Sequence, residues 1–317
     1  MNREFRHDPV MLAEVVSTFD VVPAGTIIDA TLGGGGHAAA LLDRRPDIAL
    51  VGIDRDRTAI DAASEQLARF GERFEVRRSR FDAMGAIASD IRARGRSISG
   101  VLFDLGVSSP QLDESERGFS FHHDGPLDMR MDPDSPLTAA DIVNGSSEDE
   151  LIDLLRESGE ERLASRIVRA IVSARPISTT ARLAEVVADA VPAASRRRGH
   201  PARRVFQGLR IAVNDELAQL PQSIDAAIDA LVPHGRIVIL SYHSGEDKIA
   251  KDRLRVAATG GCVCPPRLPC VCGATPTVRL IRGTKMPSAA EIARNPRAEA
   301  ARFRAAEKLG PELEEAS

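Results

Sequence analysis

The sequence predicts an α/β protein: a parallel sheet with helices on both faces, interrupted by a mostly helical insertion. Three observations predict this class. Short apolar runs alternate with helical patterns over residues 26–103. Helical patterns then follow one another without a comparable strand, until strand character returns at residues 236–240. The predicted parts of the α/β domain are residues 1–110 and 216–317, and the insertion is residues 111–215.

Four apolar runs in the first part are the predicted strands of the sheet. They are residues 26–30, 49–53, 74–77 and 99–103. Between them, apolar residues at helical spacing predict helices over residues 38–44, 58–70 and 84–93. In a parallel sheet of this kind, ligands bind beyond the carboxyl ends of the strands. Those ends carry Asp29, Asp54 and Asp104, which therefore mark the predicted site.

The insertion is predicted to be helical at four places. These are residues 148–157, 161–173, 180–191 and 204–220. Residues 113–136 are polar and contain Gly and Pro, and no element is assigned to them. A short strand at residues 278–281 and an exposed, partly helical tail from Pro287 complete the predicted chain.

Composition and charge exclude several classes of protein. The chain has 317 residues, of which 43% are apolar and 28% charged, so it can bury a sizeable core in roughly two domains. No apolar run approaches the ~20 residues of a membrane span, and the polar start lacks a secretion signal. We therefore expect a cytoplasmic protein without a membrane partner. The net charge of −4 excludes a uniformly basic nucleic-acid binder but leaves room for a local basic patch.

A glycine loop follows the first predicted strand. Residues 31–37 contain four glycines, which let the backbone approach a ligand closely and expose N–H groups at a helix start. Asp54, at the end of the second strand, can accept hydrogen bonds from both hydroxyls of a ribose. NAD and S-adenosylmethionine both contain that ribose, so either cofactor fits. The alternatives are a turn that only connects strand to helix, and a helix-capping role for Asp54.

Asp104 discriminates between the two cofactors. Enzymes that methylate exocyclic amines often place an acidic or amide side chain directly after the fourth strand, where Asp104-Leu-Gly stands in this chain. Such an amine is a poor nucleophile because its lone pair is delocalised into the ring, and a hydrogen-bond acceptor holds it near the methyl group. This position favours a methyltransferase. An NAD-dependent oxidoreductase and a non-catalytic RNA-binding assembly factor are the alternatives.

Longer segments resemble the bacterial ribosomal small-subunit RNA (cytosine-N4)-methyltransferase family, called RsmH or MraW. The matching segments run along nearly the whole chain: His7–Glu14, Asp29–His37, Gly52–Asp56, Asp104–Asp113, Glu116–Phe121, Asp124–Asp132, Gly159–Arg162, Phe206–Ile211, Val213–Leu217 and Ser241–Asp247. The resemblance implies a Rossmann-like methyltransferase fold with an inserted helical domain. It also implies an enzyme that transfers a methyl group from S-adenosylmethionine to N4 of a cytosine in the decoding region of 16S ribosomal RNA, within the assembled small subunit. The oligomeric state stays open, and a homodimer is one of the states considered.

The resemblance further implies roles for single residues. By match, Gly36, His37 and Ala38 lie at the cofactor loop. Asp54 would bind the ribose and Phe81 would flank the adenine, while Asp104 and Gln111 would line the methionine and the site of methyl transfer. This chain departs from the commonest family pattern at Gly208, Tyr242, Gly245 and Glu299, where Ala, Phe, Leu and a basic residue are usual.

Tyr242 and His243 follow the strand at residues 236–240, whose carboxyl end also faces the predicted cleft. Together with Asp104 they are the predicted catalytic residues. They would line the pocket of the target base, by stacking or by a hydrogen bond to its ring. A packing role is the alternative for His243.

Arginines are the predicted RNA contacts. The densest positive run lies in the insertion and contains Arg196, Arg197, Arg198, Arg203 and Arg204. A net-acidic protein that binds RNA must concentrate its positive charge somewhere, so we expect these side chains to contact phosphates. Arg130, within the run Asp128–Asp132, is a further candidate for a phosphate contact. A solvated loop is the alternative for the run, and a surface ion pair is the alternative for Arg130.

All four cysteines lie close together, as Cys262-Val-Cys264 and Cys270-Val-Cys272. Two pairs of thiolates can close a tetrahedral zinc site, which would be structural because no coordination position stays open. The C-x-C spacing is less typical than C-x-x-C, and the intervening Pro-Pro-Arg-Leu-Pro is stiff. The sequence alone therefore favours a short reduced hairpin without metal, with zinc as the alternative.

Overall fold

A computed structural model describes residues 9–159, 162–193, 200–265 and 271–310. The chain divides into two compact units. The sheet unit comprises Met1–Gly106 and Gln219–Ser317, and the helical unit comprises Val107–Ala218. The sequence predicts the corresponding boundaries of the insertion at residues 111 and 215.

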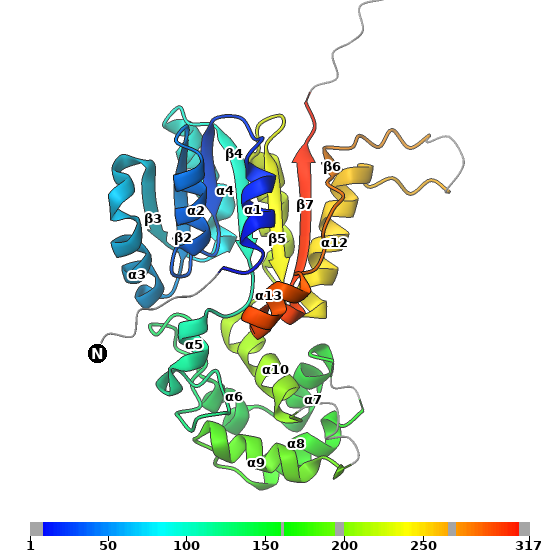
Figure 1. Cartoon of the computed structure of the whole chain (residues 1–317). Helices are drawn as coiled ribbons and strands as arrows, with labels where there is room; N and C mark the ends of the chain where they lie inside the picture. The colour runs from blue at the N-terminus through cyan, green and yellow to red at the C-terminus, as the bar shows by residue number, and fades with distance from the viewer. Residues whose placement is uncertain (1–8, 160–161, 194–199, 266–270, 311–317) are drawn as a thin grey trace, which may run out of the picture. The chain divides into compact units, whose positions relative to one another are not determined.

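The sheet unit contains a seven-stranded sheet in the order β3-β2-β1-β4-β5-β7-β6 (Figure 1). The strands are β1 Gly25–Asp29, β2 Ile48–Asp54, β3 Phe74–Arg78, β4 Ile98–Asp104, β5 Arg236–Ser241, β6 Val278–Leu280 and β7 Arg302–Lys308. β1 to β5 pair in parallel, and β7 runs antiparallel to both of its neighbours, β5 and β6. The parallel arrangement predicted for the first four strands is confirmed.

The tail is partly helical as predicted, in α13 Ala289–Arg294 and η5 Pro296–Ala300, but β7 was not predicted and is largely buried. Its sequence is Arg-Phe-Arg-Ala-Ala-Glu-Lys, whose Ala, Arg, Glu and Lys residues individually favour a helix. Pairing with the edge of β5 overrides that preference, because it buries Phe303, Ala305 and Ala306 against the core.

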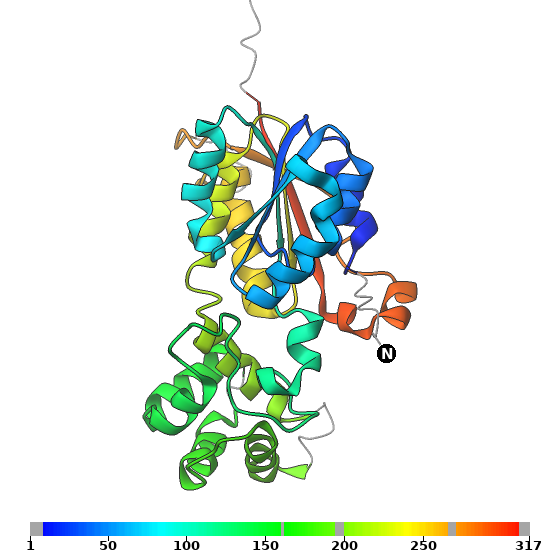
Figure 2. The same ribbon diagram turned by 90° about the vertical axis from the view of Figure 1, so that its left-hand side faces the viewer.

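Helices cover both faces of the sheet, as Figures 1 and 2 show. On one face, α1 Leu12–Phe19, α2 Gly36–Arg44 and α3 Arg57–Leu67 share an apolar core with strand residues such as Ile27, Leu50 and Leu102. On the other face, α4 Met84–Ala93, α11 Leu220–Ala230 and α12 Ser244–Thr259 pack on residues such as Ile28, Val51 and Val101. Successive strand residues thus enter opposite cores, which explains why these strands are almost continuously apolar. The short elements η1 Ala68–Arg73, η2 Phe81–Ala83, α13 Ala289–Arg294 and η5 Pro296–Ala300 complete this unit.

The helical unit has its own apolar core. Its elements are α5 Ser109–Asp113, η3 Ser115–Arg117, α6 Ala139–Gly145, α7 Glu148–Glu157, α8 Ala164–Ser173, α9 Thr180–Ala190 and α10 Ala202–Asn214. Capping boxes start α6 at Thr138 and α7 at Ser147, where each side chain satisfies a backbone N–H of the first turn. The single helix predicted over residues 204–220 is wrong: α10 ends at Asn214, Asp215 adopts a left-handed conformation with φ 50°, and α11 begins at Leu220.

Within the described parts of the chain, the helices are too short or too polar for any of them to cross a membrane.

Candidate active site at the carboxyl edge of the sheet

Three aspartates end neighbouring strands at one edge of the sheet. Asp29 ends β1, Asp54 ends β2 and Asp104 ends β4, and β1 lies between the other two strands. Asp29 is buried, and its Oδ1 accepts a hydrogen bond from the Thr31 N–H at 3.2 Å. Burial raises the pKa of Asp29 to about 8, and the nearby charges of Asp104 and Asp54 add to the rise. Asp29 is therefore mostly protonated at neutral pH, which limits the repulsion among the three carboxyl groups.

This raised pKa makes the stability of the fold depend on pH. The folded chain holds the Asp29 proton more tightly than the unfolded chain. The resulting stabilisation of the fold is therefore complete below pH 3.8 and is lost as the pH rises to about 8. Asp29→Asn keeps the shape without a titrating proton. Between those two pH values we expect the free energy of unfolding of the wild type to fall relative to Asp29→Asn, by at most about 1.4 kcal/mol per pH unit. Urea unfolding of both proteins across this range measures the difference, and parallel pH profiles would contradict the assignment.

The glycine loop leads directly into α2. Gly33 and Gly35 have φ of 51° and 82°, a left-handed conformation that favours glycine. A Cβ on Gly36 would lie 2.5 Å from Pro9 Cγ, so the loop has no room for a side chain there. The Ala39 N–H donates to the Gly35 carbonyl at 2.8 Å, which is the four-residue hydrogen bond of an α-helix.

The start of α2 is therefore a set of backbone donors. An α-helix leaves its first N–H groups without intrahelical partners, and here these belong to Gly36, His37 and Ala38. Such N–H groups, with the helix dipole behind them, bind carboxylates and phosphates. The Ala38 side chain is fully buried in the core, so this residue can contribute only through its backbone.

Asp54 ties the glycine loop to the end of β2. Its Oδ2 accepts a hydrogen bond from the Gly33 N–H at 2.8 Å, and its Oδ1 accepts one from the Asp56 N–H at 2.9 Å. Burial raises the pKa of Asp54, and these two hydrogen bonds oppose the rise. The helix cap that the sequence offered as an alternative for Asp54 is provided by Asp56, whose side chain accepts from the Thr58 N–H at 3.0 Å.

Phe81 lies just beyond the end of β3. It begins η2, and its ring meets that of Phe103 edge-on, with the ring centroids 6.2 Å apart. Two residues earlier, the Ser79 N–H donates to the Asp54 carbonyl at 2.9 Å. The aromatic ring predicted to flank an adenine thus follows a segment that is hydrogen-bonded to the backbone of the residue predicted to bind the ribose.

Asp104 is the centre of a small polar cluster. The Tyr242 O–H donates to Asp104 Oδ1 at 2.7 Å, and His37 Nδ1 lies 3.6 Å from Oδ2. His37 Nε2 lies 3.0 Å from the Val10 carbonyl oxygen, which can only accept, so the proton is on Nε2. The backbone of Asp104 is held as well, because its N–H donates to Thr31 Oγ1 at 2.6 Å.

The exposure of this cluster indicates which group can meet a ligand. The Asp104 side chain is 21% exposed, whereas that of His37 is 6% exposed. Burial and the charge of Asp104 raise the pKa of Tyr242 well above its ordinary value, so the phenol stays protonated and remains a donor. A Cβ on Gly106, where φ is 97°, would lie 3.2 Å from Tyr242 Cδ2, so glycine at this position leaves room for the ring. The Asp104 carboxylate is therefore oriented by the Tyr242 hydroxyl and still reaches the surface.

His243 has a local role in the structure. It caps α12: its Nδ1 accepts from the Gly245 N–H at 3.2 Å, and its Nε2 lies 3.0 Å from Glu246 Oε1. Both ring nitrogens thus face groups of the helix start, an arrangement that agrees with the packing alternative for this residue. Sequence reasoning missed the buried Glu246, whose Oε2 accepts from the backbone N–H of Tyr242 at 2.7 Å. The three-residue spacing from His243 to Glu246 is the capping-box pattern that could have indicated it.

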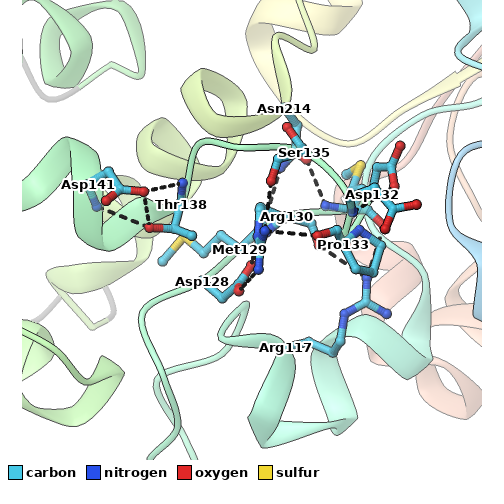
Figure 3. Close-up of polar contacts among 12 residues, drawn as sticks. Arg117, Asp128, Met129, Arg130, Asp132, Pro133, Ser135, Thr138, Asp141 and Asn214 are labelled. Atoms are coloured by element: carbon cyan, nitrogen blue, oxygen red, sulfur yellow. Dashed lines mark hydrogen bonds and ion pairs between the residues drawn. The ribbon is translucent and has the colours of Figure 1, made fainter.

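Gln111 and Arg130 belong to the helical unit. Gln111 is buried, and its Oε1 accepts from the Ser108 N–H at 3.0 Å at the start of α5. The guanidinium of Arg130 makes a bidentate pair with Asp128, at 2.9 and 2.7 Å, and donates to the carbonyls of Pro133 and Ser135 (Figure 3). All these partners of Arg130 lie in its own loop, which agrees with the alternative that Arg130 forms a surface ion pair. The role of Gln111 toward a cofactor stays a prediction.

Asn214 fixes the same loop to α10. Its Oδ1 accepts from the Met131 N–H at 2.8 Å, and its Nδ2 donates to the Met129 carbonyl at 2.7 Å (Figure 3). Both methionines are buried in the core of the helical unit. The loop that the sequence left unassigned is therefore an ordered part of this unit.

The basic run lies only partly in the described chain. Arg196, Arg197 and Arg198 are outside the described residues. Arg203 and Arg204 are exposed in the first turn of α10, and Arg204 Nη1 donates to the Gly159 carbonyl at 3.0 Å. Positive side chains at a helix start oppose the helix dipole, so helix stability does not explain this pair.

The sheet order, with one reversed strand between β5 and β6, defines a Rossmann-like methyltransferase fold. The glycine loop and Asp54 lie at the carboxyl edge of the sheet, which is the edge where sheets of this kind bind ligands. The chain belongs to the MraW methylase family, whose model matches residues 4–309. Membership of a methylase family decides against the NAD-dependent oxidoreductase alternative.

Relatives cover almost the whole chain. It is 49% identical over 314 residues to ribosomal RNA small subunit methyltransferase H of Symbiobacterium thermophilum, covering 96% of this chain and 97% of the relative. It is 46% identical to the protein of the same name from Heliobacterium modesticaldum, covering 96% of this chain and 99% of the relative. A solved structure of an rRNA methylase from Streptococcus thermophilus matches with a TM-score of 0.40 and 11% identity, covering 96% of this chain and 99% of the other.

Proposed function

We propose that this protein transfers a methyl group from S-adenosylmethionine to the N4 amine of a cytosine in the decoding region of 16S ribosomal RNA. The observation that carries the proposal is the Asp104 carboxylate, which accepts a hydrogen bond from Tyr242, lies beside His37 and the glycine loop, and still reaches the surface. The names of the relatives support a small-subunit ribosomal RNA as the substrate. The choice of N4 of cytosine rests on the family resemblance.

The residues at the sheet edge fit S-adenosylmethionine. The N–H groups of Gly36, His37 and Ala38 suit its carboxylate, and Asp54 suits its two ribose hydroxyls. A Cβ on Gly34 would meet no atom within 4 Å, so the loop is open at that point. Phe81 supplies an apolar face for the adenine. When bound, the cofactor supplies an electrophilic methyl group.

Asp104 acts on the target amine in this mechanism. One carboxylate oxygen accepts a hydrogen bond from the amine and holds its nitrogen in place for attack. The negative charge offsets the positive charge that develops on that nitrogen as its bond to the methyl group forms. The alkylated nitrogen then releases a proton to solvent, since this proton has become acidic. Tyr242 acts by positioning, because its hydroxyl donates to one oxygen of the carboxylate.

The exposed arginines at the start of α10 are proposed to bind phosphates. We expect Arg203→Gln combined with Arg204→Gln to weaken RNA binding and to reduce the slope of log affinity against log salt by roughly 0.7–0.9 for each phosphate interaction that the variant removes. Arg166→Gln combined with Arg169→Gln is the matched control, since it removes the same charge from exposed positions of α8 in the same unit. Binding isotherms at several salt concentrations measure both slopes. Equal slopes for the two double variants would mean that Arg203 and Arg204 are solvated and do not contact phosphates.

A transfer assay tests the proposed function. The protein is incubated with methyl-labelled S-adenosylmethionine and either small ribosomal subunits or naked 16S RNA from cells that lack the gene. We expect label in the RNA of the subunits, and less in naked RNA, because the resemblance implies a substrate already folded with ribosomal proteins in the cytoplasm. A protein that binds both the cofactor and the subunit but transfers no label would instead be a non-catalytic assembly factor.

A further inference from the structure

The methyl-transfer site does not use the cysteines. All four cysteines of the chain lie between residues 262 and 272, in the segment that connects α12 to β6. We name residues 260–277 the cysteine arm. In Figure 1 its described parts extend away from α12 and from the sheet. Cys262, Cys264 and Cys272 belong to those described parts, and Cys270 lies outside the described residues.

We propose that Cys262, Cys264 and Cys272 bind a zinc ion as three of its four tetrahedral ligands. Their three Sγ atoms all lie within 4.8 Å of one another, although the first and the last cysteine are ten positions apart in the sequence. The Sγ atoms of Cys262 and Cys272 are 3.6 Å apart. Two thiolates about 2.3 Å from a tetrahedral zinc lie roughly 3.8 Å from each other, so this pair already has nearly the required separation.

The same distance decides against a disulfide between these two residues in this structure. A disulfide bond is about 2.05 Å long, far shorter than the 3.6 Å between Cys262 and Cys272. Soft thiolates select zinc, copper(I) or iron–sulfur clusters. Zinc is the choice that needs no redox partner. Each thiol loses its proton to solvent as its sulfur–zinc bond forms, and no electron is transferred.

The base of the arm is closed by the backbone. The Thr277 N–H donates to the Ala257 carbonyl at 2.8 Å, and a Cβ on Gly260 would lie 2.5 Å from backbone atoms of Thr275. Gly260 and Gly261 have φ of 60° and 72°, which turns the chain out of α12 toward Cys262. The two sides of the arm therefore start close together, and this closure brings Cys272 back to Cys262 and Cys264.

Beyond its base, the arm has little apolar packing among its described residues. Val263 and Val271, the neighbours of the cysteines, are 87% and 89% exposed. A segment that buries so little apolar surface cannot offset its conformational entropy by packing. A metal bond supplies that stability directly, as in small metal-dependent domains. The thiols lie together while the adjacent valines face solvent, which is the arrangement expected of a metal-ordered turn.

Metal analysis of the full chain tests the proposal. The protein is purified under reducing conditions, incubated with Zn²⁺, freed of excess metal and analysed by mass spectrometry for metal content. We expect one zinc per chain. Replacement by Co²⁺ should give a thiolate-to-cobalt charge-transfer band and the intense visible bands of tetrahedral cobalt. Because every cysteine of the chain is in the arm, such a band can come only from this segment.

Three variants keep the test independent of folding and of methyl transfer. Cys272→Ser should lower zinc affinity at least tenfold, while Val271→Ser, at the adjacent exposed position, should retain one zinc per chain. Both should bind S-adenosylmethionine as the wild type does, which shows that the sheet unit is folded. Cys262→Ser repeats the test from the other side of the arm. Absence of zinc from the wild type, or equal zinc content in Cys272→Ser and Val271→Ser, would overturn the proposal.

Discussion

Replacing Asp104 by asparagine is expected to lower the rate constant of methyl transfer by about 10²–10³, while the fold survives. Asparagine has nearly the same shape as aspartate, and its oxygen can still accept a hydrogen bond. What it lacks is the negative charge that offsets the positive charge developing on the amine nitrogen. That charge matters mainly in the transition state, so the loss should appear in turnover rather than in binding. Single-turnover methylation with saturating cofactor and RNA measures it.

Tyr242→Phe is the matched control for this prediction. It removes the hydroxyl that donates to Asp104 at 2.7 Å but keeps the ring. We expect a loss in rate well below that of Asp104→Asn, because the carboxylate keeps its charge. If Asp104 served only to end β4, Asp104→Asn would lower the melting temperature and leave the rate constant near normal. A normal rate in a folded Asp104→Asn protein would mean that a residue other than Asp104 accepts the hydrogen bond from the target amine.

Asp54→Ala is expected to lower the affinity for S-adenosylmethionine by roughly tenfold or more. The substitution removes two hydrogen bonds to the ribose, each charge-assisted and worth about 1.5–3 kcal/mol. It also removes the carboxylate that accepts from the N–H groups of Gly33 and Asp56, so the glycine loop loses its attachment to β2. Calorimetric titration with the cofactor measures the change.

Asp56→Ala separates binding from stability in this experiment. Asp56 caps α3, and its loss should cost about 0.5–2 kcal/mol of stability. Its side chain is not the one assigned to the ribose, so the affinity for the cofactor should stay close to that of the wild type. Equal affinities of Asp54→Ala and the wild type for S-adenosylmethionine would mean that Asp54 does not bind the ribose.

The alternating part of the sheet unit could be predicted from sequence because its signals are local. Each of the first four strands is a short apolar run, and each ends at or near a residue that the site needs. β7 could not be predicted in this way. Its helix-favouring residues form a strand only because β5 offers an unpaired edge, and β5 lies more than sixty residues earlier in the chain.

The predicted site residues differ in how far sequence could place them. Asp54 and Asp104 could be placed at one edge of the sheet because strand ends converge in a parallel sheet, which is a property of the fold. The partners of a side chain depend on contacts that sequence does not display. Arg130 is paired with Asp128 only two positions away, and His243 is held by the start of α12. Both residues carry groups suited to RNA or base contacts, and the local backbone determines what those groups contact.

The methylated nucleoside is the most direct test of the central claim. Small-subunit RNA is isolated from cells with the gene, without it, and with the gene encoding Asp104→Asn, then digested and analysed by mass spectrometry. We expect a cytidine with a methyl group on N4, from the decoding region, in the first sample and its loss from the other two. The same N4-methylated cytidine at the same position in cells without the gene would mean that this protein is not the enzyme that methylates it.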